Sequence, residues 1–110
     1  MRFYGLKTCD TCRKALKALQ GAGFEPVYVD VRADGIAAAD LARFYQAFGS
    51  DLLNTRSTTW RGLDEAERGR DPLDLLAAHP TLMKRPVIEA EGVLTLGWTK
   101  AVQEKYLSAS

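Results

Sequence analysis

The alternation of β-rich and helical patterns over residues 2–31 constrains the fold more than any other feature of the chain. Residues 2–6, RFYGL, are aromatic and apolar and predict a short strand. Residues 9–20 then carry apolar side chains at helical spacing, and residues 24–31, FEPVYVDV, are β-rich again. A strand, a helix and a second strand in this order form a right-handed crossover. We therefore predict two parallel strands joined by a helix that packs on them.

The middle of the chain is predicted to be mainly helical. Residues 36–49 have an apolar face at helical spacing, and Gly49 ends the pattern. The polar stretch 50–72 is long for a loop, with room for a short helical turn at residues 64–68, and long ordered loops are often functional. Residues 72–79 form the next helix, with a proline at its first turn and Asp71 as its cap.

The last third of the chain is predicted to form a hairpin and a closing helix. Two β-rich segments flank Glu91 and Gly92, and Val102 and Tyr106 are spaced as on one helical face. Together with the first crossover, this order predicts an α/β protein with a thioredoxin-like fold. We expect a mixed four-stranded sheet and a helical insertion between its two halves.

The bulk composition limits the classes of function. The 110 residues fit one domain, residues 1–110, and 46% hydrophobic residues are enough for a core. The formal net charge is +1 at pH 7, so no overall field favours nucleic acid or membrane partners. No stretch approaches the ~20 apolar residues of a membrane span, and the first residues do not form a signal peptide. We expect a cytoplasmic protein.

Cys9 and Cys12 lie three residues apart where the first strand gives way to the first helix. A structural zinc takes about four ligands, and the chain adds only His79, so no metal is expected. A permanent disulfide is disfavoured in the reducing cytoplasm. Two interpretations stay open: both residues are small buried apolar groups, or they carry out redox chemistry.

The redox interpretation has a direct physical cause. Unpaired N–H groups at a helix N-terminus carry partial positive charge and favour a thiolate over a thiol. Thr8 to Asp10 supply the expected N-cap chemistry, and Cys9 lies at or near the cap, so it is the expected nucleophile. Cys12, one turn further on, is the candidate resolving thiol, because it can attack a mixed disulfide formed at Cys9.

Two further segments carry candidate binding residues. LLNTRSTTW at residues 52–60 offers Asn54 and Arg56 among many donors, either for an anion or peptide backbone or as a capped surface turn. In MKRPVI, the basic residue Arg85 precedes Pro86. By analogy with thioredoxin-like folds, we predict a cis Pro86 that faces Cys9, with Arg85 favouring the thiolate or binding a carboxylate. The alternative is a solvated basic pair before an ordinary trans proline.

These motifs resemble the arsenate reductase (ArsC)-like family, which includes Spx/MgsR regulators and YffB-like thiol reductases. The resemblance rests on YGLKTCDTCRKA, DVRADGI, LLNTRSTTW, KRPVI and LGW, and its central loop is most similar to the YffB-like branch. It implies a nucleophilic Cys9 and glutathione as reductant. We therefore predict a glutathione-dependent thiol-disulfide reductase with Cys9, Cys12 and Arg85 as catalytic residues. The predicted contacts of substrate or glutathione are Lys7, Thr8, Asn54, Arg56 and Pro86.

The same resemblance implies the partners and two alternatives. Glutathione is the co-substrate, with no bound cofactor, and glutaredoxin or protein disulfides are further partners. The first alternative is an Spx-like redox-sensing regulator that binds the RNA polymerase α subunit, because such regulators share the CxxC motif. The second is an arsenate reductase. Those enzymes bind the oxyanion with three arginines, whereas here only Arg85 matches, with Asn54 at the first position and Leu96 to Trp98 at the third.

Overall fold

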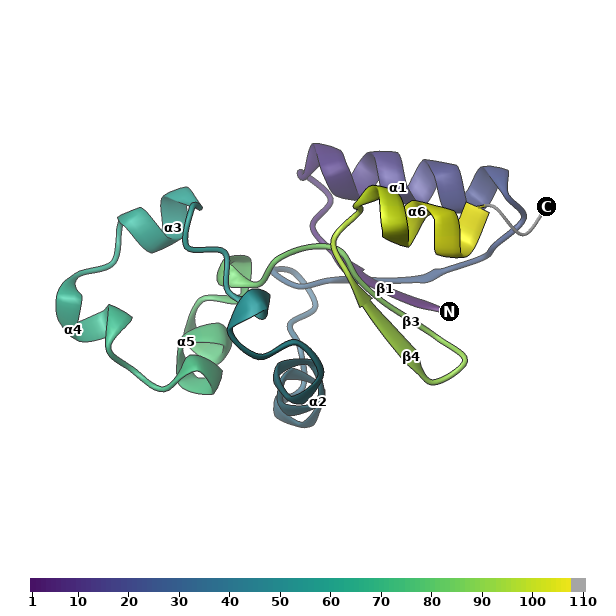
Figure 1. Cartoon of the computed structure of the whole chain (residues 1–110). Coiled ribbons are helices and arrows are strands. Elements are labelled where there is room, and N and C mark those ends of the chain that lie inside the picture. Colours follow the sequence, from purple (N-terminus) through teal and green to yellow (C-terminus); the bar gives the residue numbers. More distant parts are fainter. Residues whose placement is uncertain (108–110) are drawn as a thin grey trace. The chain divides into compact units, whose positions relative to one another are not determined.

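The four strands form one mixed sheet, in the order β2-β1-β3-β4 (Figure 1). In this computed structural model, which describes residues 1–107, strands β1 (Arg2–Gly5) and β2 (Val27–Asp30) run parallel. Strand β3 (Val87–Ala90) is antiparallel to β1, and β4 (Val93–Leu96) is antiparallel to β3. The predicted crossover and mixed four-stranded sheet are therefore confirmed.

Helices α1 (Asp10–Gly21) and α6 (Lys100–Leu107) cover one face of this sheet (Figure 1). They pack there because each presents apolar side chains to the strands, and these meet in a common core of Phe3, Cys12, Ala15, Leu19, Ile88 and Tyr106. The hydroxyl groups of Thr95 and Tyr106 are 3.0 Å apart and share a hydrogen bond that ties α6 to β4. Residues 1–30 and the described chain from Arg85 onward form one compact unit.

The turn between β3 and β4 is made by Glu91 and Gly92, as the sequence predicts. Both residues have positive φ values, 52° and 78°, which is the conformation of a two-residue type I′ hairpin turn. Its twist matches that of the flanking strands, so the turn fixes the register in which Ala90 pairs with Val93. Glu91 adopts the left-handed region, which residues with a side chain rarely occupy, and Gly92 adopts it at the second position without that cost.

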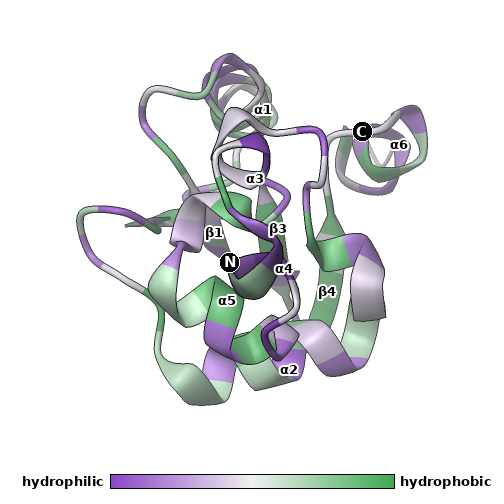
Figure 2. Cartoon of the chain, turned by 90° about the vertical axis from the view of Figure 1, so that its left-hand side faces the viewer, coloured by the Kyte–Doolittle hydropathy of each residue, from purple (hydrophilic) through white to green (hydrophobic). Residues whose placement is uncertain are grey.

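Residues 31–84 form the second compact unit, which is the predicted helical insertion. It contains α2 (Ala38–Phe48) and α5 (Pro72–Ala78), and Figure 2 shows both hydrophobic and hydrophilic residues along α2. The carboxylate of Asp71 accepts a hydrogen bond from the N–H of Leu73 at 3.0 Å, which confirms the predicted cap. The buried hydrophobic side chains of this unit are largely leucines: Val31, Leu41, Phe44, Leu52, Leu75, Leu76, Leu82 and Met83.

The polar stretch after α2 contains more structure than the sequence predicts. The expected turn is α4 (Glu65–Arg68), but a further helix, α3 (Thr58–Arg61), precedes it, and short 3-10 helices span Gly49–Leu52 and Pro80–Leu82. The side chain of Ser57 caps α3 by accepting the N–H of Trp60 at 3.1 Å. Single helical turns leave little hydrophobic periodicity, which is why their sequence reads as a loop. Among residues 1–107, no helix is both long and apolar enough to cross a membrane.

Gly5, the last residue of β1, is expected not to tolerate a side chain. A Cβ atom there would lie 2.8 Å from the ring of Phe3, 2.9 Å from Sγ of Cys12 and 3.1 Å from Oη of Tyr28. We expect Gly5→Ala to lower the free energy of unfolding by about 1–3 kcal/mol, the usual cost of overpacking. Urea unfolding of both proteins measures the difference.

Gly21→Ala is the matched control for this prediction. Gly21 ends α1, and a Cβ atom there would meet nothing within 4 Å. Alanine has the higher helix propensity, so this change should leave stability unchanged or raise it by up to about 1 kcal/mol. Equal effects of the two substitutions would contradict the close packing at Gly5.

Candidate active site at the start of helix α1

Cys9 occupies the N-cap position of α1. Its backbone is extended, with φ −86° and ψ 121°, its N–H donates to the carbonyl of Leu6 at 2.9 Å, and its carbonyl accepts from Arg13 at 3.0 Å. The prediction that Cys9 lies at or near the cap is confirmed, but no side-chain oxygen of Thr8 or Asp10 forms the expected cap. The turn that follows β1 places Cys9 at the N-cap, so a sulfur atom, and not an oxygen, lies at the positive end of the helix dipole.

The surroundings of Cys9 favour its thiolate. Partial burial opposes the charge, but it is outweighed by hydrogen bonds from the backbone and the thiol of Cys12 and by the hydrogen bond and charge of Arg85. The net effect lowers the pKa of Cys9. The residue is half-buried and both cysteines are free thiols. A reachable sulfur with a lowered pKa is more readily ionised than an ordinary thiol, which is the property of a candidate nucleophile.

Cys12 has the opposite environment. Its side chain is 0% exposed and belongs to the core that α1 and α6 form with the sheet. Burial is the largest cause that raises its pKa to about 12, and the neighbouring Cys9 adds to it, against a hydrogen bond from the backbone of Leu6 and the charge of Arg85. Cys12 is therefore a protonated thiol that donates to the sulfur of Cys9. One helical turn therefore separates a sulfur whose pKa is lowered from one whose pKa is raised.

Arg85 and Pro86 complete the site from the start of β3. The Arg85–Pro86 peptide bond is cis, which confirms the predicted isomer, and Pro86 is buried with its carbonyl accepting the N–H of Gly97 at 2.8 Å. Nε of Arg85 is also buried, and its guanidinium interacts with Cys9. The alternative of a solvated basic pair before a trans proline is therefore wrong for Arg85.

The remaining predicted contacts fall into two groups. Lys7 and Thr8 are exposed in the turn that precedes Cys9, and the N–H of Lys7 donates to the carboxylate of Asp30 at 3.2 Å. Asn54 and Arg56 belong to the second unit. There the side-chain oxygen of Asn54 accepts the N–H of Arg56 at 3.1 Å, so this amide also shapes its own turn, while the Arg56 side chain is exposed.

Two residues of β2 next to the cysteines were not predicted from the sequence. Asp30 is 5% exposed and pairs in register with Gly5, and Tyr28 pairs with Phe3. Burial and the nearby negative charges of Cys12, Asp30 and Cys9 raise the pKa of Tyr28 to about 12, so it keeps its proton. The predicted crossover could have indicated Asp30, because parallel strands bring their carboxyl ends to one edge of the sheet, and the cysteines follow the carboxyl end of β1.

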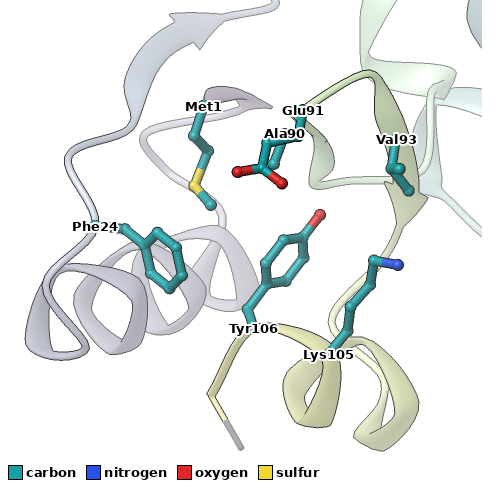
Figure 3. A pocket seen from close by; sticks show the side chains of 7 residues that line it. All are labelled: Met1, Phe24, Ala90, Glu91, Val93, Lys105 and Tyr106. Atoms are coloured by element: carbon teal, nitrogen blue, oxygen red, sulfur yellow. The ribbon is translucent and has the colours of Figure 1, made fainter. Parts of the chain in front are cut away.

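A cavity of about 480 Å³ lies at the other end of β1 (Figure 3). Figure 3 shows the carboxylate of Glu91 and the ring of Tyr106 directed into it. Its lining, Met1, Phe24, Ala90, Glu91, Val93, Lys105 and Tyr106, includes none of the predicted site residues. Within residues 1–107, no three His, Cys, Asp or Glu side chains gather as metal ligands.

Comparison with known proteins agrees with this geometry. A model of the ArsC family matches residues 4–106. The chain belongs to the ArsC family. It therefore has the thioredoxin-like, arsenate reductase-related fold of thiol reductases.

Individual ArsC-like proteins match nearly the whole chain. An uncharacterised protein of Haemophilus influenzae is 42% identical over 102 residues, covering 88% of this chain and 90% of that one. The solved structure of the YFFB protein has a TM-score of 0.88 and 32% identity, covering 96% of this chain and 97% of that one. An arsenate reductase (ArsC) related protein from Brucella melitensis has a TM-score of 0.72 and 36% identity, covering 96% and 92%.

Removal of the Arg85 charge is expected to raise the pKa of Cys9. Without its hydrogen bond and charge, Arg85→Met leaves burial less opposed, so less thiolate is present at pH 7 and alkylation of Cys9 is slower. The rate of iodoacetamide modification against pH, read by mass spectrometry, measures the shift.

Arg2→Met is the control for this change. Arg2 is exposed and begins β1, whereas Cys9 follows the end of that strand, so the same net charge is lost far from the sulfur. Its alkylation profile should match that of the unmodified protein. A profile unmoved by Arg85→Met, or moved equally by both variants, would contradict a specific effect of Arg85.

Proposed function

We propose that this protein is a glutathione-dependent thiol–disulfide reductase in which Cys9 is the nucleophile. The observation that carries the proposal is the half-exposed sulfur of Cys9 at the start of α1, with its pKa lowered by the backbone and thiol of Cys12 and by Arg85. Membership of a family with an arsenate reductase-related fold supports a reaction at this sulfur.

The reaction begins with attack of the Cys9 thiolate on a disulfide. A bond forms between Cys9 and one sulfur of the substrate, the substrate S–S bond breaks, and the other sulfur leaves as a thiolate that takes a proton from solvent. The mixed disulfide is resolved in one of two ways. In the first, a glutathione attacks at Cys9 and releases the remaining substrate thiol, and a second glutathione reduces the Cys9–glutathione disulfide that results. In the second, Cys12 attacks Cys9 and releases the same thiol, and two glutathione molecules then reduce the Cys9–Cys12 disulfide. Either route returns the free thiols and consumes two glutathiones, which leave as their disulfide.

The neighbouring residues have distinct parts in this scheme. Arg85 stabilises the Cys9 thiolate before attack, and its charge also suits a carboxylate of glutathione. Lys7 and Thr8 are exposed beside Cys9 and are the proposed contacts of the glutathione backbone, together with Pro86. Asn54 and Arg56 are proposed as further contacts. Cytoplasmic glutathione, with glutaredoxin or protein disulfides as partners, would supply the co-reactants.

Substitution of each cysteine separates the two thiols by their roles. We expect Cys9→Ser to abolish glutathione-dependent reduction of a small mixed disulfide, because a serine hydroxyl is not ionised at pH 7. Cys12→Ser should slow turnover without abolishing it if glutathione resolves the adduct directly. Oxidation of NADPH through glutathione reductase reports both rates.

Three other outcomes would change the proposed function. Equal and complete loss of turnover in both variants would require a strictly dithiol mechanism. Turnover of arsenate with glutathione and glutaredoxin would favour an arsenate reductase. Redox-dependent capture of the C-terminal domain of the RNA polymerase α subunit, without any glutathione-dependent turnover, would overturn the proposal in favour of a regulator.

A further inference from the structure

The absence of a side chain at Gly5 brings two reactive groups to one small space. An atom at the Cβ position of Gly5 would lie 2.9 Å from Sγ of Cys12 and 3.1 Å from Oη of Tyr28. Both groups therefore border the same point, one from α1 and the other from β2. Gly5 and Tyr28 come from the paired strands β1 and β2, so the backbone register of the sheet fixes this arrangement.

The Tyr28 side chain is held firmly but its hydroxyl is not used. Its ring stacks on Phe3, with centroids 5.1 Å apart and planes inclined by 30°. The hydroxyl oxygen is buried and, within the described chain, makes no hydrogen bond. A buried polar group without a partner costs free energy, so such groups are rare in folded proteins and call for an explanation.

The resolving step creates a need for a hydrogen-bond donor at this place. Cys12 must become a thiolate to attack the mixed disulfide, but burial opposes its charge. When Cys9 is part of a mixed disulfide it no longer carries the negative charge that opposes ionisation of Cys12, whereas the burial remains. The backbone N–H of Leu6 is one donor to this sulfur. A second donor would stabilise the buried anion further.

We propose that the hydroxyl of Tyr28 donates a hydrogen bond to the sulfur of Cys12 as that sulfur ionises, making Tyr28 a catalytic residue of the resolving step. This inference rests on the proposed function. In the step, the Cys12–Cys9 bond forms, the bond between Cys9 and the substrate sulfur breaks, and the departing thiolate and the Cys12 proton together leave as a thiol. Tyr28 neither gains nor loses a proton overall.

The electrostatics of Tyr28 agree with the role of a donor. Burial and the charges of Cys12, Asp30 and Cys9, only partly offset by Arg85, hold its pKa near 12. The hydroxyl therefore keeps its proton at neutral pH and can donate it in a hydrogen bond. The charged groups that act on the Tyr28 hydroxyl thus include both cysteine sulfurs, Cys9 and Cys12.

Release of nitrothiobenzoate from dithiobis(nitrobenzoate) separates the two steps in the intact protein. Attack by Cys9 releases the first equivalent, and closure by Cys12 releases the second. We expect Tyr28→Phe, which keeps the stacked ring, to leave the first phase unchanged. The second phase should slow by about three- to tenfold, because a tenfold loss of thiolate is partly offset by its greater nucleophilicity. The pH midpoint of the second phase should also rise, which a purely structural role of Tyr28 would not cause.

Tyr4→Phe is the matched control. Tyr4 is buried in β1 and, by strand alternation, points to the face of the sheet opposite Phe3 and Gly5. The substitution therefore removes a tyrosine hydroxyl from the same sheet, but on the face away from Cys12. Neither phase should change. If Tyr28→Phe folds poorly, fluorotyrosine at position 28 provides a second variant: its more acidic hydroxyl is a stronger donor and should lower the pH midpoint of the second phase.

The outcomes distinguish this inference from the proposed function. Two phases that Tyr28→Phe and fluorotyrosine leave unmoved would overturn the role of Tyr28 alone. A single equivalent released from the unmodified protein would show that Cys12 does not resolve, which also overturns the inference but leaves Cys9 as the nucleophile. Release of no equivalent would reject the reactivity of Cys9 and with it the proposed function.

Discussion

The interaction on which the site depends is that between the positive end of α1 and the sulfur at its N-cap. A helix that begins at Asp10 leaves N–H groups of its first turn without partners inside the helix, and the backbone of Cys12 directs one of them at Cys9. An oxygen at this position would serve only as a cap. A sulfur there gains a lower pKa, so the start of the helix also favours the thiolate of Cys9.

The two cysteines differ because a helix turns one side toward the sheet and the other toward solvent. Cys9 lies at the N-terminal start of the helix, where it is partly exposed and close to Arg85. Cys12 lies on the side of the helix that packs with Phe3 and Ile88. Burial then keeps one thiol protonated while its neighbour ionises. The sulfur with the lowered pKa is the nucleophile and the one with the raised pKa the resolving thiol in the function we propose.

The pairing of β1 with β2 also determines which polar groups lie next to the two cysteines. Gly5 leaves room for the sulfur of Cys12 and the hydroxyl of Tyr28 on one side of β1, and Asp30, beside Gly5, accepts the N–H of Lys7 in the turn before Cys9. Strand β2, through Tyr28 and Asp30, thus positions polar groups around both cysteines. Packing and electrostatics are not separable here, because the missing side chain of Gly5 is what allows the polar groups to approach.

The sequence by itself determined the strand and helix order, the cysteine pair at the start of α1 and the proline at the start of β3. These follow from local patterns: alternation, helical spacing, turn residues and the spacing of Cys9 and Cys12. It placed Cys9 only at or near the N-cap, because Thr8 and Asp10 are better capping residues than cysteine, and it did not reveal the single-turn helix α3. Only the tertiary structure decided that Cys12 is buried and that Tyr28 borders its sulfur. Those properties depend on which residues of distant strands and helices meet, and local patterns do not encode such distances.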